Sequence, residues 1–321
     1  MDEAGCRNDA LLFATATSSS GLSTVVGASE VDNFTWALVV GCRCRNWHAR
    51  GVTGVEDTIL KAVGVGKTYT AHGHRTRALS ALDLEIAAGQ FVSIIGPSGC
   101  GKSTFLRLVG GLFEPDRGSI EVAGESPAAG RASKRFGLVP QTPALLPWRT
   151  VRENVALLGS LNKGQGRGAV GDEEIDDLLE SVGLAPFADV LPAALSGGMQ
   201  QRVALVRAFA LRPPILLMDE PFAGLDEITR SDMRFLLLDL WRDTRATVLF
   251  VTHSIEEAIL LSDRVVVFTS RPGRVFTELD IDLARPREHG LEDAGHFHAL
   301  AAELRAALHQ AVDADKRRPA G

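Results

Sequence analysis

The stretch GPSGCGKST (96–104) holds the residue types that point most directly to chemistry in this 321-residue chain. It fits the pattern G-x-x-x-x-G-K-[S/T], follows the apolar run FVSII (91–95) and precedes a helical pattern, which is the context in which this pattern binds phosphate. Glycines let backbone N–H groups wrap a phosphate, Lys102 places its charge on the β- and γ-phosphates, and Ser103 offers a hydroxyl to Mg²⁺. The sequence therefore predicts a nucleotide-phosphate loop made of Gly96, Pro97, Ser98, Gly99, Cys100, Gly101, Lys102, Ser103 and Thr104.

Two carboxylates follow a second apolar run, ILLM (215–218). We expect this run to be a strand, and α/β proteins bind ligands at the carboxyl ends of parallel strands. Carboxylates in such a place require solvent, a partner or a cation. Asp219 is therefore suited to hold Mg²⁺, directly or through water, whereas Glu220 points elsewhere and could orient or deprotonate an attacking water.

A second glycine-rich stretch, LSGGMQQR (195–202), has the residues of a helix start that could bind an anion. Ser196 is a favourable N-cap residue, and Gly197 and Gly198 allow close approach of another backbone. The N-terminus of a helix can bind an anion, but the residues of this stretch alone do not say which one.

Three further residues give weak signals when each is considered alone. His253 ends an apolar run in VTHS, and a lone histidine at a strand end is more often structural than catalytic. Gln141 lies in a predicted loop, where glutamine is usually solvated. Tyr69 is the only tyrosine of the chain; it could stack on a base, although ordinary packing is the default for a lone aromatic residue.

Short apolar runs rich in branched residues alternate with helical patterns along the chain. The runs are typical of strands buried on both faces of a parallel sheet, and they lie at 91–95, 215–218, 248–252 and 264–268. The helical patterns lie at 102–112, 199–211, 227–243 and 254–262. This alternation predicts an α/β fold.

Other segments show a different periodicity. ALDLEI (81–86) and SIEVAG (119–124) alternate apolar and polar residues, which predicts a small antiparallel sheet with one solvated face. The segment 142–195 is predicted to be mostly helical and is interrupted by KGQGRGAVG (163–171). HALAAELRAALHQAV (298–312) predicts an amphipathic helix.

The domain organisation follows from changes in composition. Residues 1–55 are rich in Ser, Thr, Ala and Gly with little periodicity, and we expect a mostly disordered extension. The organised domain is predicted over 56–290, followed by a C-terminal helix and tail over 291–321.

The bulk composition limits the class of protein. A net charge of −6 gives no basic excess that would indicate a nucleic-acid partner, and no apolar run approaches the roughly 20 residues of a membrane-spanning helix. Four cysteines are typical of a reducing compartment, and Cys42, Cys44 and His48 fall short of a standard zinc pattern. The acidic start is unlike a signal peptide, so we expect a cytoplasmic protein that would reach a membrane only by docking onto a membrane-spanning partner.

In combination, six ordered motifs resemble the nucleotide-binding subunit of an ATP-binding cassette (ABC) transporter over about 58–287. The motifs are Tyr69, GPSGCGKST, Gln141, LSGGMQQR, LLMDEPFAGLD and VTHS, and LSGGMQQR is the signature of the family. The resemblance implies a P-loop NTPase (ABC ATPase) core with a parallel sheet, a small antiparallel β-subdomain and an α-helical subdomain at about 142–195. It also implies ATP as the nucleotide and Mg²⁺ as its metal ion.

The resemblance also implies a role for each matched residue in the hydrolysis of ATP. Tyr69 would stack on adenine, and the loop from Gly96 to Thr104 would bind the phosphates. Ser103 and Asp219 would bind Mg²⁺, and Gln141 would contact both Mg²⁺ and the attacking water. Glu220 would be the catalytic carboxylate, and His253 would contact the γ-phosphate.

The implied assembly is a head-to-tail dimer with two ATP molecules between its subunits. The signature of one subunit, with Ser196, Gly197 and Gly198, would complete the site formed by the phosphate loop of the other, and Asp226 would cross the interface. The partner is either a second copy of this chain or a paired ABC subunit. The resemblance also implies a separate transmembrane permease, and hence a peripheral location at the cytoplasmic face of the inner membrane.

Three short stretches of the sequence bear on the class of transported solute. The stretches 144–157, 271–275 and 283–287 resemble ATPases of nitrate, sulfonate and taurine importers, which implies uptake of a small anionic solute delivered by a solute-binding protein. The alternative is a soluble ABC ATPase that acts in translation or DNA maintenance. Against it, the chain has a single phosphate loop and a single signature, and the segment between Gln141 and Ser196 lacks the sustained heptads of a coiled coil.

Two details of the motifs affect these expectations. FAGLD in place of FGALD and THS in place of THD are departures from the family pattern that remove no catalytic side chain. Cys100 lies inside the phosphate loop, so its oxidation or alkylation is expected to hinder ATP binding if the thiol is accessible.

Overall fold

The computed structural model describes residues 58–71, 73–160 and 171–316. The expected disordered extension (1–55), the cysteines within it and nearly all of the glycine-rich stretch at 163–171 lie outside these residues.

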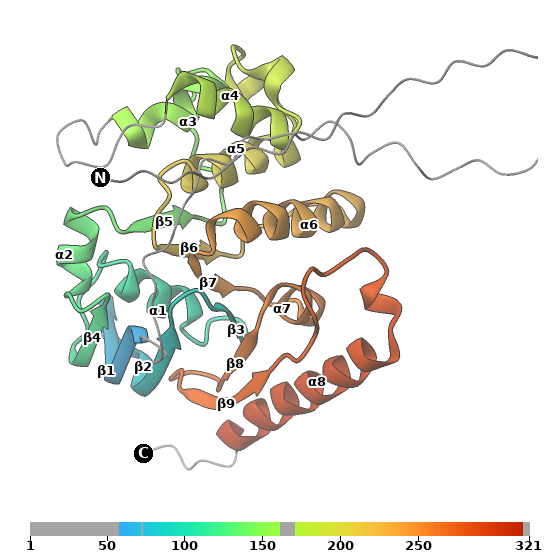
Figure 1. Cartoon of the computed structure of the whole chain (residues 1–321). Helices are drawn as coiled ribbons and strands as arrows, with labels where there is room; N and C mark the ends of the chain where they lie inside the picture. Colours follow the sequence, from blue (N-terminus) through green and yellow to red (C-terminus); the bar gives the residue numbers. More distant parts are fainter. Residues whose placement is uncertain (1–57, 72, 161–170, 317–321) are drawn as a thin grey trace, which may run out of the picture. The chain divides into compact units, whose positions relative to one another are not determined.

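A six-stranded sheet forms the centre of the described part of the chain (Figure 1). Neighbouring strands pair in parallel except at one edge, where the last strand runs antiparallel to its neighbour. In spatial order the strands are β5 (Phe136–Val139), β6 (Ile215–Asp219), β7 (Thr247–Val251), β3 (Phe91–Ile95), β8 (Arg264–Phe268) and β9 (Val275–Asp280). All residues of β3 and β7 are buried, as expected of parallel strands covered on both faces. The α/β fold and its four predicted strands are thereby confirmed, to within one residue at each end.

Alternate residues of these strands pack against different helices. Phe91, Leu216 and Val248 share a core with α5 (Gly197–Phe209) and α6 (Glu227–Thr244). Their chain neighbours Val92 and Leu217 face the opposite way and pack with α1 (Lys102–Val109) and the antiparallel sheet. A third core joins β8 to α7 (Ile255–Leu261) and α8 (Gly295–Lys316). The C-terminal helix expected at 298–312 is therefore present and longer than predicted.

The smaller sheet is antiparallel, in the order β2 (His74–Ala87), β1 (Thr58–Ala71), β4 (Arg117–Val122). Leu82, Leu84 and Ile86 of β2 are buried, whereas Asp83 and Glu85 are exposed, which confirms the predicted alternation. A short helix, α2 (Pro127–Ala132), follows β4. The strand β1 is a correction to the sequence analysis, which did not predict it.

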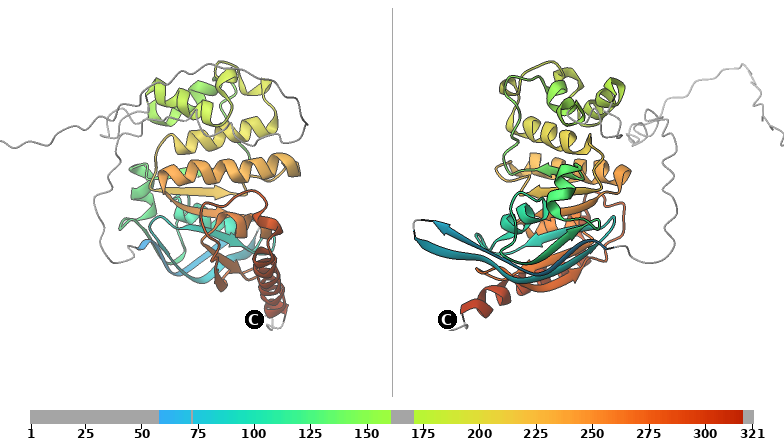
Figure 2. Two further views of the ribbon diagram at one scale, coloured as in Figure 1. Left: turned by 45° about the vertical axis from the view of Figure 1, so that its right-hand side comes forward. Right: turned by 90° about the vertical axis from the view of Figure 1, so that its left-hand side faces the viewer.

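The segment at 142–195 forms the helical part of the structure. It contains α3 (Val151–Ser160), α4 (Asp172–Ser181) and two short 3₁₀ turns, Ala185–Phe187 and Pro192–Ala194. Val155 of α3 and Leu179 of α4 belong to the same core as α5, and α5 and α6 lie between these helices and the central sheet (Figure 2). The helical prediction holds, although residues before Val151 form no helix.

Two arginine side chains hydrogen-bond to carbonyl oxygens at the C-terminal end of α7. The buried Arg287 guanidinium donates hydrogen bonds to the carbonyl oxygens of Ile259, Leu260 and Ser262 at 2.8, 2.6 and 2.6 Å, and burial lowers its pKa to about 10. Arg285 donates to the Leu261 carbonyl at 2.8 Å. The stretch 283–287 thus stabilises the C-terminal end of α7, because these two cations donate hydrogen bonds to carbonyl groups that a helix end leaves unpaired. This helix begins directly after the loop that carries His253.

The turn between β8 and β9 lies against the predicted phosphate loop. Gly273 donates its N–H to the Ala78 carbonyl at 2.8 Å, and its carbonyl accepts from Ser80 N–H at 3.1 Å. A Cβ atom added at Gly273 would lie 2.1 Å from the carbonyl oxygen of Cys100. Only glycine fits between the two backbones, so this turn and the loop are held together closely.

We therefore expect Gly273→Ala to lower the free energy of unfolding by about 1–3 kcal/mol, because the backbones must separate to admit a methyl group. Gly295→Ala is the matched control, since a Cβ atom there meets nothing within 4 Å. Urea denaturation followed by circular dichroism measures both. Equal stability of the two variants would contradict the close packing of this turn.

Candidate nucleotide-binding site

The sheet topology brings the predicted site residues together. The phosphate loop follows β3, Glu220 follows β6 and His253 lies just after β7, and these strands are neighbours in the order β6, β7, β3. Because the three strands are parallel, their carboxyl ends lie at one edge of the sheet. Residues far apart in the sequence therefore face one another there.

The phosphate loop has a backbone that requires glycine. Gly99 and Gly101 have φ values of 73° and 109°, which side chains rarely tolerate. A Cβ atom on Gly101 would also lie 2.8 Å from the Ala78 carbonyl oxygen. The loop leads directly into α1 at Lys102, so the N-terminus of this helix points at the space that the loop encloses.

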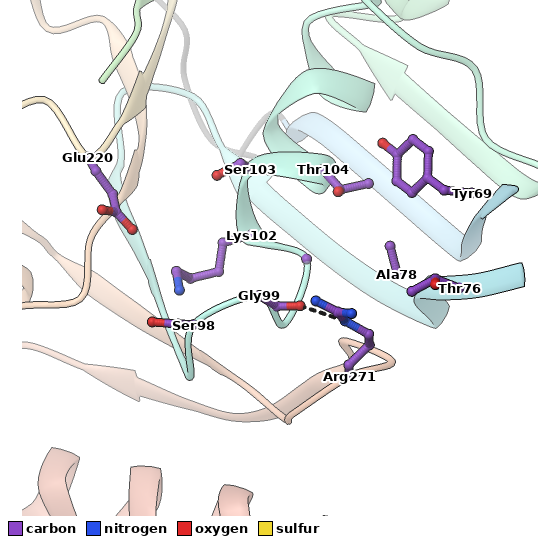
Figure 3. Close-up of a pocket in the computed structure, with 11 residues that line it drawn as sticks. Tyr69, Thr76, Ala78, Ser98, Gly99, Lys102, Ser103, Thr104, Glu220 and Arg271 are labelled. Carbon is purple, nitrogen blue, oxygen red and sulfur yellow. Dashed lines mark hydrogen bonds between the residues drawn. The ribbon is translucent and has the colours of Figure 1, made fainter. Parts of the chain in front are cut away.

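A cavity of about 350 Å³ lies over this loop (Figure 3). It combines the loop with residues of the antiparallel sheet, of the end of β6 and of the β8–β9 turn. Its lining consists of Tyr69, Thr76, Ala78, Ser98, Gly99, Gly101, Lys102, Ser103, Thr104, Glu220 and Arg271. The structure thus places Tyr69, the loop and Glu220 around one space, as expected, and adds Arg271, which the sequence analysis did not single out.

Lys102 is held over the loop by the loop's own backbone. Its side chain is 5% exposed, and its Nζ donates to the carbonyl oxygens of Gly96 at 2.8 Å and Pro97 at 3.2 Å. A buried ammonium group with only neutral acceptors favours an anion as its next partner.

Of the three residues predicted to bind Mg²⁺, Ser103 and Asp219 contact each other through a hydrogen bond, which Gln141 does not join. Ser103 Oγ donates to Asp219 Oδ1 at 2.7 Å, so a hydroxyl and a carboxylate oxygen meet beside the loop. Such oxygen donors fit Mg²⁺, which prefers hard ligands and is commonly shared with phosphate. Gln141 is exposed and does not line the cavity. In the described residues, Gln141 forms no hydrogen bond with Ser103 or Asp219.

Glu220 and His253 form a second pair. The backbone of Glu220 has φ 47°, and its N–H donates to the Val251 carbonyl at 2.9 Å, which fixes the residue at the end of β6. Its Oε2 lies 3.2 Å from His253 Nδ1, and the histidine side chain is 64% exposed. The carboxylate is thus held at the rim of the cavity by a partner that itself faces outward.

The loop that carries His253 is stabilised by the buried carboxylate of Glu257, which was not predicted from the sequence. Glu257 hydrogen-bonds to the Thr252 hydroxyl, which accepts from Ser254 N–H at 3.0 Å, and Ser254 Oγ accepts from Glu257 N–H at 3.2 Å. Burial raises the pKa of Glu257 above its usual range. The spacing Ser254-x-x-Glu257 is a helix-start pattern that could have revealed this group.

The signature stretch begins α5, as expected. Ser196 is the N-cap residue, and its Oγ accepts from Met199 N–H at 3.3 Å. Asp226 caps α6 in the same way, with Oδ1 3.0 Å from Thr229 N; this bond lowers the pKa of Asp226. Neither Asp226 nor any residue from Ser196 to Gly198 lines the cavity over the phosphate loop. Within one chain, the signature is therefore not part of that space.

The effect expected of Cys100 modification depends on an accessible thiol, and the structure buries this residue. The Cys100 side chain is 1% exposed and faces Gly96, where an added Cβ atom would lie 3.2 Å from Sγ. Burial raises the pKa of this thiol above its usual range, despite the nearby Lys102 charge. The condition of an accessible thiol is not met, so Cys100 contributes to the loop through its backbone.

We expect iodoacetamide to alkylate Cys100 at neutral pH at least about tenfold more slowly in the folded protein than in urea, because the reactive thiolate is disfavoured and covered. Peptide mass spectrometry measures the alkylation rate of Cys100 separately from the rates of the other three cysteines. Equal rates in both conditions would show that the thiol is open to solvent.

The loop between β3 and α1, with carboxylates at the end of β6, a parallel strand separated from β3 by β7, defines a P-loop NTPase. The sequence model of the family described as ABC transporter matches residues 79–223. A putative ATP-binding protein of Brucella abortus is 46% identical over 242 residues, which cover 75% of this chain and 91% of that protein. The chain belongs to the ATP-binding proteins of ABC transporters and is an ATPase.

Two relatives are named for a transported solute. The aliphatic sulfonates import ATP-binding protein SsuB 2 of Burkholderia cenocepacia is 44% identical over 239 residues, 74% of this chain and 84% of that protein. The taurine import ATP-binding protein TauB of Roseobacter denitrificans is 41% identical over 227 residues, 68% of this chain and 83% of that protein.

Solved structures show the same fold. A dimeric post-hydrolysis state of the ATP-binding cassette MJ0796, bound to ADP and Pi, has a TM-score of 0.61 and 35% identity, and the match covers 70% of this chain and 100% of that one.

Across the residues that the structure of the present chain describes, each helix is too short or too polar to cross a bilayer.

Proposed function

We propose that this chain powers the uptake of a small anionic solute, of the nitrate, sulfonate or taurine type, through a separate transmembrane permease. The observation that carries this proposal is the similarity to two import ATPases, one for aliphatic sulfonates and one for taurine, at 44% and 41% identity. A solute-binding protein would deliver the solute, and the chain would bind at the cytoplasmic face of the membrane. The alternative role in translation or DNA maintenance is not favoured by these relatives.

We also propose that two subunits form the hydrolytic site together. The phosphate loop lines a cavity to which the residues from Ser196 to Gly198 do not contribute, although they begin a capped helix suited to an anion. In a head-to-tail dimer, the signature of one subunit would meet the phosphate loop of the other. The dimeric MJ0796 structure supports this arrangement.

The side chains around the cavity suggest how ATP would be hydrolysed. Lys102 and the loop N–H groups would bind the β- and γ-phosphates, and Tyr69 would stack on adenine. Glu220 would accept a proton from the attacking water, while His253 would hold the Glu220 carboxylate in place and contact the γ-phosphate.

Mg²⁺ would be held by Ser103 and Asp219, whose oxygens already lie together, and when bound it would balance the charge of the phosphates. Gln141 would also contact Mg²⁺ and the attacking water. Once the γ-phosphate leaves, the attraction between the two subunits would weaken and the dimer would reopen.

An exposed apolar patch on the helical segment supports docking onto a permease. It consists of Trp148, Phe187 and Leu191, which are 71%, 37% and 46% exposed. Backbone hydrogen bonds from Val151 and Arg152 to the 188–190 stretch join the two parts of the patch. Exposed large apolar side chains that gather in this way mark interaction surfaces.

The test is purification of the complex from membranes of cells that express the tagged chain together with its genomic neighbours. We expect an integral membrane permease to co-purify, and Trp148→Ala to reduce its recovery. Val63→Ala, which truncates an exposed apolar residue of β1, is the matched control and should not reduce it. Recovery with ribosomes or DNA in place of a permease would contradict the proposal.

A further inference from the structure

The turn between β8 and β9 places an arginine at the nucleotide cavity. The strand β8 is the parallel neighbour of β3, so its carboxyl end lies at the same sheet edge as the phosphate loop. Arg271 follows this strand and lines the cavity together with Lys102 and Tyr69 (Figure 3). We propose that the Arg271 guanidinium binds the polyphosphate of the nucleotide as a second cation beside Lys102, an inference that rests on the proposed nucleotide site.

The contacts of Arg271 fix its position relative to the loop. Its Nε donates to the Gly99 carbonyl at 3.0 Å, and its Nη2 lies only 2.7 Å from where a Cβ atom of Gly99 would be. The guanidinium therefore lies against the loop at a residue whose φ of 73° calls for glycine. Since Nε alone is engaged there, the two Nη groups remain available to oxygens inside the cavity.

The turn that carries Arg271 is rigid. Thr269 and Arg274 join its two ends through a backbone hydrogen bond of 3.0 Å, and Thr269 Oγ1 donates to the Pro272 carbonyl at 3.2 Å. Gly273 anchors the turn to β2 through hydrogen bonds with Ala78 and Ser80. A side chain on such a support loses little further freedom when it binds a ligand.

The charge balance at the cavity favours an anion beside Arg271. Across the ranges that the structure describes, the guanidinium forms no ion pair with a carboxylate, and Lys102 likewise meets only carbonyl oxygens. Two cations and a helix N-terminus thus face one space, against one carboxylate in its lining, that of Glu220. Arginine binds phosphate oxygens through parallel N–H donors, a geometry that lysine cannot reproduce.

A purely structural role for Arg271 makes a different prediction. If the residue only pinned the turn to Gly99, its loss would disturb the loop for every ligand alike. If it binds phosphate, its loss must matter more as the number of phosphates grows. Affinities for ATP, ADP, AMP and adenosine therefore separate the two roles.

The experiment is calorimetric titration of the full chain and its variants with these four ligands. We expect Arg271→Ala to weaken ATP binding about tenfold or more, to weaken AMP less and to leave adenosine unchanged. Arg271→Lys should recover part of the loss. Arg274→Gln is the control from the same turn, because Arg274 contacts Ser80 Oγ at 3.3 Å and does not line the cavity.

Two results would overturn the inference: unchanged ATP affinity in Arg271→Ala, or an equal loss for all four ligands. Lys102→Ala in the same series tells which claim has failed. If Lys102→Ala loses ATP affinity while Arg271→Ala does not, only the role of Arg271 is wrong. If neither variant loses affinity, the nucleotide site itself is wrong and the inference falls with it.

Discussion

Replacing Glu220 with glutamine is expected to slow ATP hydrolysis by about 10²- to 10⁴-fold, the usual contribution of a general base. The amide keeps the shape of the side chain and can still hydrogen-bond to His253 Nδ1, which lies 3.2 Å from Glu220 Oε2. It cannot accept a proton from water. ATP binding should remain close to that of the unaltered chain, because Lys102 and the loop backbone are untouched.

The variant should also accumulate as a dimer with ATP, since the γ-phosphate, which would hold the subunits together in the proposed dimer, is not removed. Steady-state phosphate release and gel filtration with ATP measure the two effects. Glu121→Gln is the control, because Glu121 is an exposed carboxylate of β4 that does not line the cavity over the phosphate loop. Near-normal turnover in Glu220→Gln would show that another group activates the water.

Replacing Ser196 with arginine is expected to abolish hydrolysis while the monomer still binds ATP. Ser196 is exposed at the start of α5, so the larger side chain fits without crowding the core, and the lost N-cap bond costs only about 1 kcal/mol of stability. The arginine would fill the space that the phosphate loop of a partner subunit occupies in the proposed dimer. The subunits could then no longer close around ATP.

Ser181→Arg is the control for adding an arginine at an exposed serine, here at the end of α4, and should hydrolyse ATP normally. Isothermal titration gives the affinity of each monomer for ATP, and phosphate release gives turnover. Loss of ATP binding by the Ser196→Arg monomer would point instead to a site formed within one chain.

The sequence predicts both limits of β3 and β8 because each strand consists mainly of buried apolar residues and is bounded by polar or glycine positions. The strand β1 escapes prediction for a physical reason. Its sequence TILKAVGVGKTYTA contains two glycines, leaves Val63 exposed and pairs with β2 through several register shifts. A regular alternation of apolar and polar residues is therefore absent from it.

The site is predictable as far as local patterns reach. The phosphate loop, Asp219 and Glu220 are recognised because each pattern combines a strand end with the chemistry that follows it. Arg271 escapes recognition because its position depends on the packing of Gly273 against Cys100, a contact between segments distant in the sequence.

If one hydrolytic site needs residues of two chains, an equal mixture of Ser196→Arg and Lys102→Ala chains should hydrolyse ATP although neither variant does so alone. Each variant alone should be inactive, since every site in its dimers lacks a working signature or a working phosphate loop. A mixed dimer contains one intact site, formed by the loop of the first chain and the signature of the second. We predict that phosphate release rises to as much as about a quarter of the rate of the unaltered chain, since half of the dimers are mixed and each restores one of two sites. No increase over the separate variants, with mixed dimers confirmed by native mass spectrometry, would contradict a site shared between subunits.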